Sequence, residues 1–402
     1  MTSILHTLRN EVQEVLTTNI LPYWIHRMID TRGGFYGRIN GNDELIPEAD
    51  KGAILNARIL WTFSAAYRLL RRKDYLQVAT RAKRVIINDF FDKEYGGIYW
   101  SLKNNGIPSD TKKQIYALGF AIYGLSEYHR ATGDEESLNY AIRLFRDIET
   151  HSFDTVKNGY REATTRDWQE IADMRLSEKD ANERKTMNTH LHILEPYTNL
   201  YRVWKDEQLK EQIRNLVLLF IEKIKHPDTH HLQLFFDDDW NSKHSIISYG
   251  HDIEASWLIH EAALELGDTE LLAKVEPVIQ QIAIAASEGL TDNGGMMYET
   301  NGTETDTDYH WWVQAETVVG YLNIYQHFGD KESLKKSLRC WDFIKSHLID
   351  HTHGEWLWSV HADGTPNHED DKAGFWKCPY HNGRMCMEII ERFNLSYKPI
   401  LD

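Results

Sequence analysis

The sequence is poor in cysteine and in long apolar runs. Its 402 residues include three cysteines, Cys340, Cys378 and Cys386, and no CxxC pair, so it offers neither a disulfide framework nor a thiolate zinc site. No stretch approaches the run of about 18 apolar residues that a membrane-spanning helix needs. Residues 1–19 mix charged and apolar side chains and lack the apolar core of a signal peptide. These features predict a cytoplasmic protein.

Positive charge is also scarce. The 45 lysines and arginines are outnumbered by 61 acidic residues, which leaves a formal net charge of −16. Such a charge repels the phosphates of nucleic acids and of anionic membranes. We therefore expect no nucleic-acid partner and no membrane partner. At 42% hydrophobic residues, the chain still has enough apolar mass for a large core.

Motifs of several enzyme classes are missing. There is no HExxH motif, no glycine-rich phosphate loop after a strand and no GxSxG elbow, so zinc hydrolysis, nucleotide cofactors and serine esterase chemistry have no support. Two HxH pairs occur, His190/His192 and His351/His353, but on a helix such side chains point about 200° apart and do not converge on one ion. We predict neither a metal site nor a cofactor.

A weak six-fold repeat runs along the chain. An aspartate followed within a few residues by glycine and then by aromatic or apolar residues recurs, as in DTRGGFYG and DKEYGGIYW. The starting residues lie 58 to 74 positions apart and are Asp30, Asp92, Asp154, Asp228, Asp292 and Asp350, of which Asp228 lacks the following glycine. Such a period is typical of repeated supersecondary units.

The segments between these loops carry apolar residues at the i, i+3, i+4 and i+7 spacing of helices. This spacing predicts twelve helices, near residues 3–18, 50–71, 74–90, 112–131, 134–149, 188–204, 206–225, 246–266, 268–286, 310–328, 330–348 and 376–393. Six helical hairpins either extend as an open solenoid or close into a ring. We expect closure, because neither terminal pair resembles a polar cap. The sequence thus predicts an all-α (α/α)6 barrel, a single domain over residues 1–402, with an irregular helical bundle as the alternative.

Alternating helices in such a barrel would start all inner helices at one end, so that their first turns surround one cavity. Polar and aromatic residues that a buried helix does not need occur in these turns; they are Arg58, Tyr116, Asn188, His192, His251, Glu254, Trp257, Trp312, Glu316, His381 and Arg384. Residues three or four apart share a helix face. By this spacing, the aligned pairs are Asn188 with His192, His251 with Glu254, and Trp312 with Glu316.

Imidazoles suit acid–base chemistry near neutral pH, because their ordinary pKa is about 6.5. Two histidines in one cavity can remove and return a proton on a carbon next to a carbonyl, which is the chemistry of an isomerase or epimerase. A glycoside hydrolase would use two facing carboxylates instead. Glu254, Glu316 and Asp180 could supply such a pair, so the hydrolase hypothesis stays open at this point.

Four blocks of the sequence resemble a known family. The chain contains, in order, MNTHLHILE, YGHDIEASWL, WWVQAE and GFWKCPYHNGRMCME, and these are similar to blocks of the N-acylglucosamine 2-epimerase superfamily. The last block, with Trp376 and the Cys-Pro-Tyr-His that begins at Cys378, resembles the cellobiose 2-epimerases within it. The resemblance covers essentially the whole chain. It implies a cofactor-independent epimerisation at carbon 2 of the reducing-end glucose of β-1,4-linked disaccharides such as cellobiose, mannobiose and lactose.

The resemblance also implies roles for individual residues. His381 and His251 match the acid–base pair that moves the proton through an enediolate, and His192 matches a third essential histidine that assists ring opening. Essential polar groups are matched by Arg58, Glu254 and Glu316, with Arg58 placed to stabilise the enediolate. The expected substrate contacts are Tyr116, Asn188, Asp180, Trp312 and Trp376, with Trp376 stacking on the second sugar, together with Trp257 on the face of His251 and Glu254.

Three alternatives to this activity remain. A 2-epimerase or aldose–ketose isomerase that acts on a free monosaccharide such as mannose would differ only in whether the cavity accepts a second sugar. A glycoside hydrolase would release monosaccharides, and a sugar-binding protein would bind without turnover. In each case the expected partner is a small sugar, and we expect the protein to be a monomer.

Overall fold

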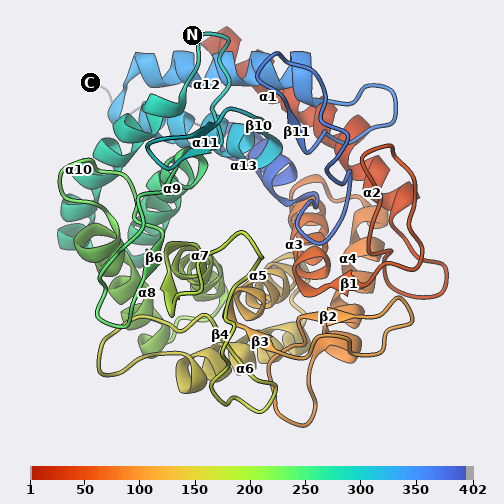
Figure 1. The fold of residues 1–402 in the computed structure, drawn as a ribbon. Coiled ribbons are helices and arrows are strands. Elements are labelled where there is room, and N and C mark those ends of the chain that lie inside the picture. The colour runs from red at the N-terminus through yellow and green to blue at the C-terminus, as the bar shows by residue number, and fades with distance from the viewer. Residues whose placement is uncertain (1, 395–402) are drawn as a thin grey trace.

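The computed structural model describes residues 2–394, which form a ring of helices around a central axis (Figure 1). Thirteen α-helices lie in this range, and α1 and α2 together form one of the twelve positions of the two layers. The inner helices are α3 (Ala53–Leu70), α5 (Ile115–Thr132), α7 (Met187–Val203), α9 (Tyr249–Leu266), α11 (Trp311–Phe328) and α13 (Tyr380–Asn394). The outer layer consists of α1 (Thr2–Val15) with α2 (Leu21–Arg27), α4 (Lys73–Val85), α6 (Glu135–His151), α8 (Glu207–Leu219), α10 (Thr269–Ala286) and α12 (Lys331–Phe343). Short π-helical turns extend α1, α4, α8 and α12, at Leu16–Ile20, Ile86–Phe90, Phe220–Ile224 and Ile344–Leu348, and a 3-10 turn at Ser287–Gly289 follows α10.

The inner helices close the ring. Each packs against the next one along the chain, and α13 packs against α3. Most outer helices lie mainly against one inner helix, with α1 on α13 and α4 on α3, whereas α8 packs against both α7 and α9 (Figure 1). The inner helices are buried nearly all round, whereas the outer helices bury one apolar face, as expected for the two layers. The predicted (α/α)6 barrel is confirmed.

Helix boundaries differ from the prediction at both ends of the chain. The helix predicted at 3–18 continues through α2 to Arg27, because Pro22 falls in the first turn of α2, where a missing N–H is tolerated. The helix predicted at 376–393 begins only at Tyr380. Pro379 precedes it, and a proline disfavours the helical conformation of the residue before it. Several inner helices also begin about three residues later than predicted.

Those later starts are caused by two-residue strands, which the sequence analysis does not predict. The strands are β1 (Lys51–Gly52), β2 (Ser101–Leu102), β3 (Lys113–Gln114), β4 (Ala163–Thr164), β5 (Lys185–Thr186), β6 (Phe235–Phe236), β7 (Ile247–Ser248), β8 (Glu299–Thr300), β9 (Thr305–Asp306), β10 (Tyr309–His310) and β11 (Ser359–Val360). The pairs β1–β2, β3–β4, β5–β6, β7–β8 and β10–β11 each join the start of one inner helix to the loop of the next unit. Ile39 and Ala373 exchange hydrogen bonds of 2.7 and 3.1 Å and join the last unit to the first.

The repeated aspartates fix these strands in place. Asp30 pairs with Lys51 of β1 at 2.9 Å, and Asp92 pairs with Lys113 of β3 at 2.9 Å. The same pairing joins Asp154 to Lys185 and Asp350 to Lys372. Each lysine stands in or beside the strand that leads into an inner helix. In four of the six units the repeated aspartate therefore forms an ion pair beside the start of an inner helix.

Short Gly-Asp connections reverse the chain at the other end of the barrel. Gly133 ends α5 in the left-handed conformation, with a φ of 77°, and the Asp134 side chain accepts the backbone N–H of Ser137 to begin α6. The same device follows α9 and α11, at Asp268 and Asp330. Within residues 2–394, no helix is sufficiently long and apolar to cross a membrane.

Candidate active site

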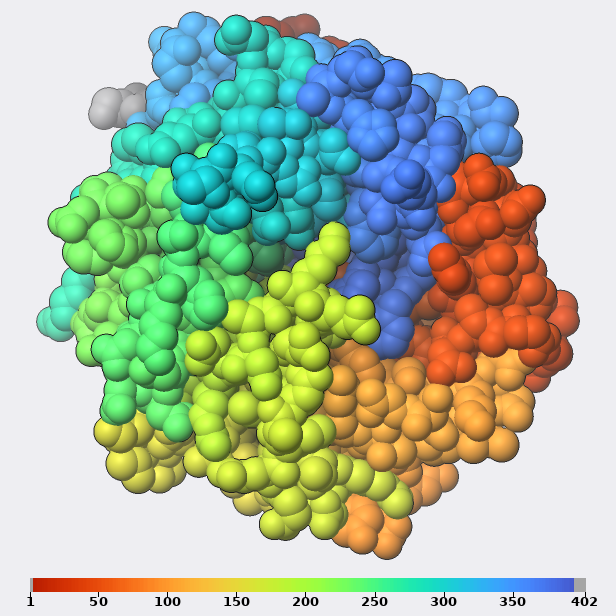
Figure 2. Space-filling view, in the orientation of Figure 1, coloured from red at the N-terminus to blue at the C-terminus, as the bar shows by residue number. Residues whose placement is uncertain are grey.

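The ring of strands surrounds the mouth of a cavity of about 760 Å³. All six inner helices contribute to its wall with residues from their first turns, as the sequence analysis expects. Figure 2 shows the hollow at the centre of this face, beside the yellow-green segment that follows α6. The predicted site residues on the wall are Arg58, Tyr116, Asp180, Asn188, His192, His251, Glu254, Trp312, Trp376 and His381. The volume lies in the range that small-molecule sites occupy.

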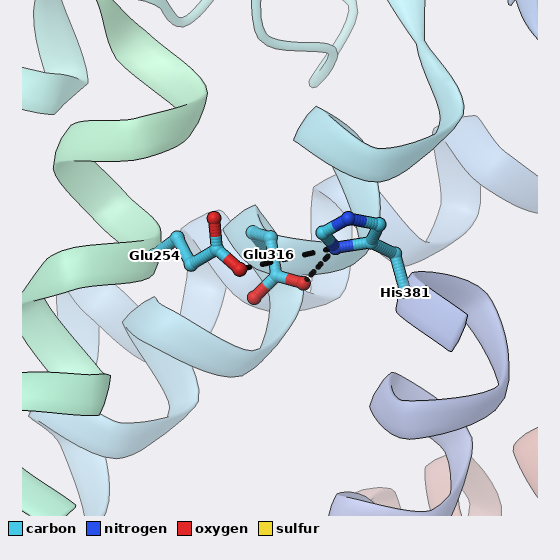
Figure 3. A group of neighbouring side chains, drawn as sticks. All are labelled: Glu254, Glu316 and His381. Carbon is cyan, nitrogen blue, oxygen red and sulfur yellow. Dashed lines mark hydrogen bonds and ion pairs between the residues drawn. The ribbon is translucent and has the colours of Figure 1, made fainter. Parts of the chain in front are cut away.

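His381 is oriented by a carboxylate. Its Nδ1 lies 2.7 Å from Oε1 of Glu316 on α11, so Nδ1 carries the hydrogen and Nε2 is left as the basic nitrogen (Figure 3). Trp257 holds the other oxygen of Glu316, with its indole N–H 3.0 Å from Oε2. Burial, together with the nearby positive charges of Arg58 and Arg384, lowers the pKa of His381 well below its ordinary value. The imidazole is therefore neutral and able to act as a base.

His251, like His381, contacts the ring of Trp312. The Trp312 ring centroid is 4.7 Å from that of His251 and 5.6 Å from that of His381. His251 Nδ1 is 2.8 Å from the hydroxyl of Ser248, which precedes α9. Burial lowers the pKa of His251 to about 3. Two neutral imidazoles thus contact the same tryptophan ring.

His192 is the third imidazole on the cavity wall. Its Nδ1 lies 3.0 Å from Oε2 of Glu195, one turn further along α7, and its Nε2 lies 3.9 Å from Oε2 of Glu254. Gly119 of α5 lets α7 approach closely here, because a Cβ at this position would fall 2.4 Å from the His192 carbonyl oxygen. Burial lowers the pKa of His192, although Glu195 opposes this effect.

Arg58 brings a buried positive charge to the cavity. Its guanidinium donates to the Tyr116 hydroxyl at 2.9 Å and to the Trp376 carbonyl at 3.3 Å, and it lies 4.2 Å from the centroid of the Phe120 ring. These partners are neutral, so the charge of Arg58 is not cancelled by a contacting carboxylate. An arginine placed in this way can stabilise an oxyanion that forms in the cavity.

A buried cluster of carboxylates surrounds Arg384. Its Nη2 donates to Oε1 of Glu254 at 2.7 Å and to Oε1 of Glu316 at 2.6 Å, and its Nη1 contacts Glu195 and the Tyr380 hydroxyl. Burial raises the pKa of Glu254 well above its ordinary value, and the charge of Glu316 adds to this rise. The guanidinium opposes both effects. Arg384 is therefore the counter-ion of this cluster.

The same cluster has the spacing of a metal site. One ligand atom each from Glu254, Glu316 and His381 lie within 4.8 Å of one another. Figure 3 shows the three side chains pointing toward one another. Arg384, however, donates to the same Oε1 atoms that a metal ion would bind. Since the guanidinium already neutralises these oxygens, the arrangement does not require a metal. That the protein uses no metal stays a prediction.

The cavity also offers groups for sugar hydroxyls and sugar rings. Oδ1 of Asn188 has no hydrogen-bond partner within the described part of the chain. Trp376 lies next to Tyr116 and Trp100, with ring centroids 5.9 and 5.8 Å apart. Asp180 stands on the loop over the mouth, where it accepts the backbone N–H of Ser177 at 2.9 Å. Aromatic faces and convergent polar groups of this kind are typical of sugar sites.

Comparison with known proteins decides the family. The family model of N-acylglucosamine 2-epimerase (GlcNAc 2-epimerase) matches residues 34–383. The chain belongs to the N-acylglucosamine 2-epimerase family. It is 69% identical to a cellobiose 2-epimerase of Bacteroides fragilis, over 95% of this chain and 98% of that protein, and 42% identical to one of Ruminococcus albus, with the same coverage. The solved structure of cellobiose 2-epimerase from Bacillus thermoamylovorans superposes with a TM-score of 0.93 at 44% identity, over 96% of this chain and all of that one.

Two predicted site residues of this epimerase-family member do not lie on the cavity wall. Glu316 is just behind the wall and reaches the site through His381. Trp257 is buried deeper, where its ring lies 4.8 Å from the Arg384 guanidinium. The structure therefore corrects the predicted substrate contact of Trp257 to a contact with Glu316, because Trp257 lies one turn further along α9 than Glu254 and so below the cavity.

Sequence reasoning missed Glu195 and gave Arg384 no role. A signal was present, because Glu195 follows His192 by three residues and Arg384 follows His381 by three residues, so each shares a helix face with a predicted catalytic histidine. A charged residue on the face of a buried histidine needs a partner. His190, by contrast, does not line the cavity and packs with Nδ1 on the Thr186 carbonyl and Nε2 accepting the N–H of Tyr160.

Proposed function

We propose that this protein is a cellobiose 2-epimerase, which converts the reducing-end glucose of cellobiose to mannose without a cofactor. The observation that carries the proposal is the meeting of His192, His251, His381 and Arg58 on one cavity wall. Neutral imidazoles beside a buried positive charge suit the removal of a proton from a carbon that becomes an enediolate. The high identity to cellobiose 2-epimerases supports the choice of reaction and of disaccharide.

The proposed reaction begins with ring opening, assisted by His192, which exposes the aldehyde at carbon 1. This aldehyde makes the proton on carbon 2 acidic. One histidine of the His251/His381 pair removes that proton, the electron pair forms the C1–C2 double bond, and negative charge moves to the carbon 1 oxygen beside Arg58. The other histidine then returns a proton to the opposite face of carbon 2, and the aldehyde and the ring form again as mannose.

Inversion at carbon 2 needs groups on two sides of the sugar. His251 on α9 and His381 on α13 both contact the ring of Trp312 on α11, the helix between theirs, which supports their assignment as the acid–base pair. Hydrogen bonds to Ser248 and Glu316 hold their Nδ1 atoms, so each has its Nε2 for the substrate. Acid–base help of this kind contributes on the order of 10²–10⁴ in rate.

Hydrolysis is the less favourable alternative. A glycoside hydrolase needs two carboxylates that flank the scissile bond. Glu254 and Glu316 instead bind the same Nη2 of Arg384, and Glu316 lies behind the wall. An epimerase or isomerase of free mannose would leave the Trp376 side of the cavity without a sugar to contact.

The deciding experiment follows cellobiose in deuterated water. We expect glucosyl-mannose that carries deuterium at carbon 2, measured by NMR and mass spectrometry, and at least about a 100-fold loss of rate in His381→Ala. Parallel incubations with mannobiose, lactose and mannose compare disaccharides with a monosaccharide. Release of free glucose, or product without deuterium, would contradict the proposed reaction.

We also infer that the enzyme works as a monomer in the cytoplasm. All three cysteines are buried free thiols, which suits a reducing compartment. Light scattering coupled to gel filtration is expected to give a mass close to 47.1 kDa for the chain. A mass near twice this value would contradict the monomer.

A further inference from the structure

A continuous chain of buried hydrogen bonds joins His192 to His381. From His192 Nδ1 it passes to Glu195 and from the other oxygen of Glu195 to Arg384. From Arg384 Nη2 it continues to Oε1 of Glu316, which receives Nδ1 of His381 at 2.7 Å. The side chains in this chain are at most 6% exposed. Two imidazoles from α7 and α13 therefore share one ionic network below the cavity.

Glu195 is the branch point of this network. Its Oε2 lies 3.0 Å from His192 Nδ1, whereas its Oε1 receives both the Tyr380 hydroxyl and the Arg384 guanidinium. Although burial opposes its charge, Arg384 and His192 lower the pKa of Glu195 to about 2. An ionised carboxylate only accepts hydrogen bonds. Its contact with Nδ1 therefore requires the hydrogen of His192 on Nδ1 and leaves Nε2 bare.

We propose that Glu195 is a positioning residue of the epimerisation, which fixes the Nδ1–H tautomer of His192 and, through Arg384, the placement of Glu254 and Glu316. This inference rests on the proposed function. Glu195 does not line the cavity, so it acts through His192 and Arg384 and not on the sugar. Glu195 holds Nδ1 of His192 in the same way that Glu316 holds Nδ1 of His381.

A purely structural role would not account for this network. Three carboxylates around one guanidinium are costly to bury, and replacing buried ion networks by apolar side chains is often neutral or stabilising. The network faces one end of the cavity, and two of the acids, Glu254 and Glu316, lie 3.9 and 2.7 Å from His381. Its geometry is that of groups that orient imidazoles, as in triads where a carboxylate fixes the histidine tautomer.

The test uses Glu195→Gln, which keeps the shape but supplies an amide in place of the charge. The amide N–H₂ can donate to Nδ1, which reverses the tautomer of His192. We expect kcat for cellobiose to fall by at least about 30-fold, with KM changed less than about threefold, because a reversed tautomer costs as much as about 10⁴ in a comparable triad. Glu195→Asp, which keeps the charge, is expected to recover part of this loss.

The matched control is Glu149→Gln. Glu149 also accepts two tyrosine hydroxyls, from Tyr197 of α7 at 2.7 Å and from Tyr160 at 2.8 Å, but it contacts no imidazole and does not line the cavity. We expect its kcat to stay within about twofold of the wild type. An equal loss of kcat in both variants would overturn the proposal, because it would indicate a general effect on the packing of α7.

A direct readout is the nitrogen NMR spectrum of histidine-labelled protein without substrate, with the His192 signals assigned by their loss in His192→Gln. We expect Nδ1–H in the wild type and the reversed tautomer in Glu195→Gln. An Nε2–H tautomer in the wild type overturns the proposal even if the variant does not fold, as does wild-type kcat in Glu195→Gln. Absence of epimerase activity in the wild type would reject the proposed function alone, because the tautomer is measured on the resting protein.

Discussion

Burial sets the protonation of the histidines around the cavity. An ordinary histidine titrates near neutral pH, but the pKa of His251 is lowered to about 3 and that of His381 also falls. The unfolded chain takes up protons from about pH 6.5 downward, whereas the folded chain leaves these imidazoles neutral. Because the unfolded state then binds more protons, the free energy of unfolding contributed by these groups falls as the pH falls.

His251→Gln tests this linkage. The variant is expected to lose less stability than the wild type between pH 7 and pH 5, by on the order of 1 kcal/mol, because His251 is partly exposed to the cavity and water reduces the full effect. Urea denaturation at both pH values measures the difference. Glu162, whose pKa burial raises to about 8, titrates in both proteins and cancels in the comparison. Equal losses would show that His251 titrates normally.

We expect Trp376 to distinguish a disaccharide from a monosaccharide. Its ring stands on the cavity wall beside Tyr116, and its carbonyl accepts a hydrogen bond from Arg58. Trp376→Ala is expected to lower kcat/KM for cellobiose about tenfold, as loss of one aromatic contact does, and to change kcat/KM for mannose less than twofold. Steady-state rates with both sugars check this prediction. Equal losses of kcat/KM for cellobiose and mannose would contradict the assignment of Trp376 to the second sugar.

The site residues were predictable to the extent that they share helix faces. The spacing of His251 with Glu254, and of Asn188 with His192, identifies side chains that meet on the cavity wall. The spacing does not show how far below the cavity a residue lies. It therefore predicts a substrate contact for Trp257, although this side chain contacts Glu316 instead. How far below the cavity a residue of α9 lies depends on how α9 packs between its neighbours α7 and α11.

At the scale of elements, the loops before the inner helices are held by buried ion pairs. Asp92 receives Lys113 at 2.9 Å and also both donors of Arg166, at 2.8 and 3.1 Å. Arg166 belongs to the segment that leads to the mouth loop with Asp180. One aspartate thus connects β3 at the start of α5 with the loop that covers the cavity.

Asp92→Ala should destabilise the fold by about 3 kcal/mol, because it leaves the ammonium of Lys113 buried without its carboxylate. The matched control is Asp292→Ala. Asp292 holds the equivalent place in the fifth unit but is exposed, so its loss should cost less than about 0.5 kcal/mol. Urea midpoints of the two variants give the comparison. Similar midpoints would mean that the ion pair adds nothing.

The elements themselves were largely predictable, whereas the strands were not. Helical spacing and the Gly-Asp turns located the helices to within a few residues, apart from the continuation to Arg27. A strand of two residues is too short to show an alternating pattern. β1 and the other two-residue strands form because a strand of the neighbouring unit pairs with them, so the local sequence does not predict them.

At the scale of the whole molecule, we predict that the buried charge of Arg384 serves in place of a metal ion. Arg384 supplies the positive charge to Glu254 and Glu316. Exhaustive dialysis against a chelator is therefore expected to leave kcat for cellobiose within about 20% of its original value, and added Mn²⁺ or Zn²⁺ should not raise it. Loss of activity that returns with a divalent ion would contradict the prediction.

Closure of the barrel was predictable from the repeat, because six similar hairpins without polar caps bury their faces only by meeting end to end. The register in which the first and last units meet was not predictable. It depends on Ile39 and Ala373, which stand more than 300 residues apart and form a single bridge outside any regular pattern. Contacts of this sequence separation leave no trace in a window of neighbouring residues.

The same closure determines when the molecule becomes an enzyme during synthesis. α13 fills the gap between α11 and α3 and carries His381 and Arg384. Until this helix has left the ribosome, the nascent chain exposes the faces of α1, α3 and α11 that pack against α13, and it lacks His381. A chain released before α13 is made would therefore be both prone to aggregate and inactive. Protein quality control needs to recognise only its exposed apolar helix faces to remove it.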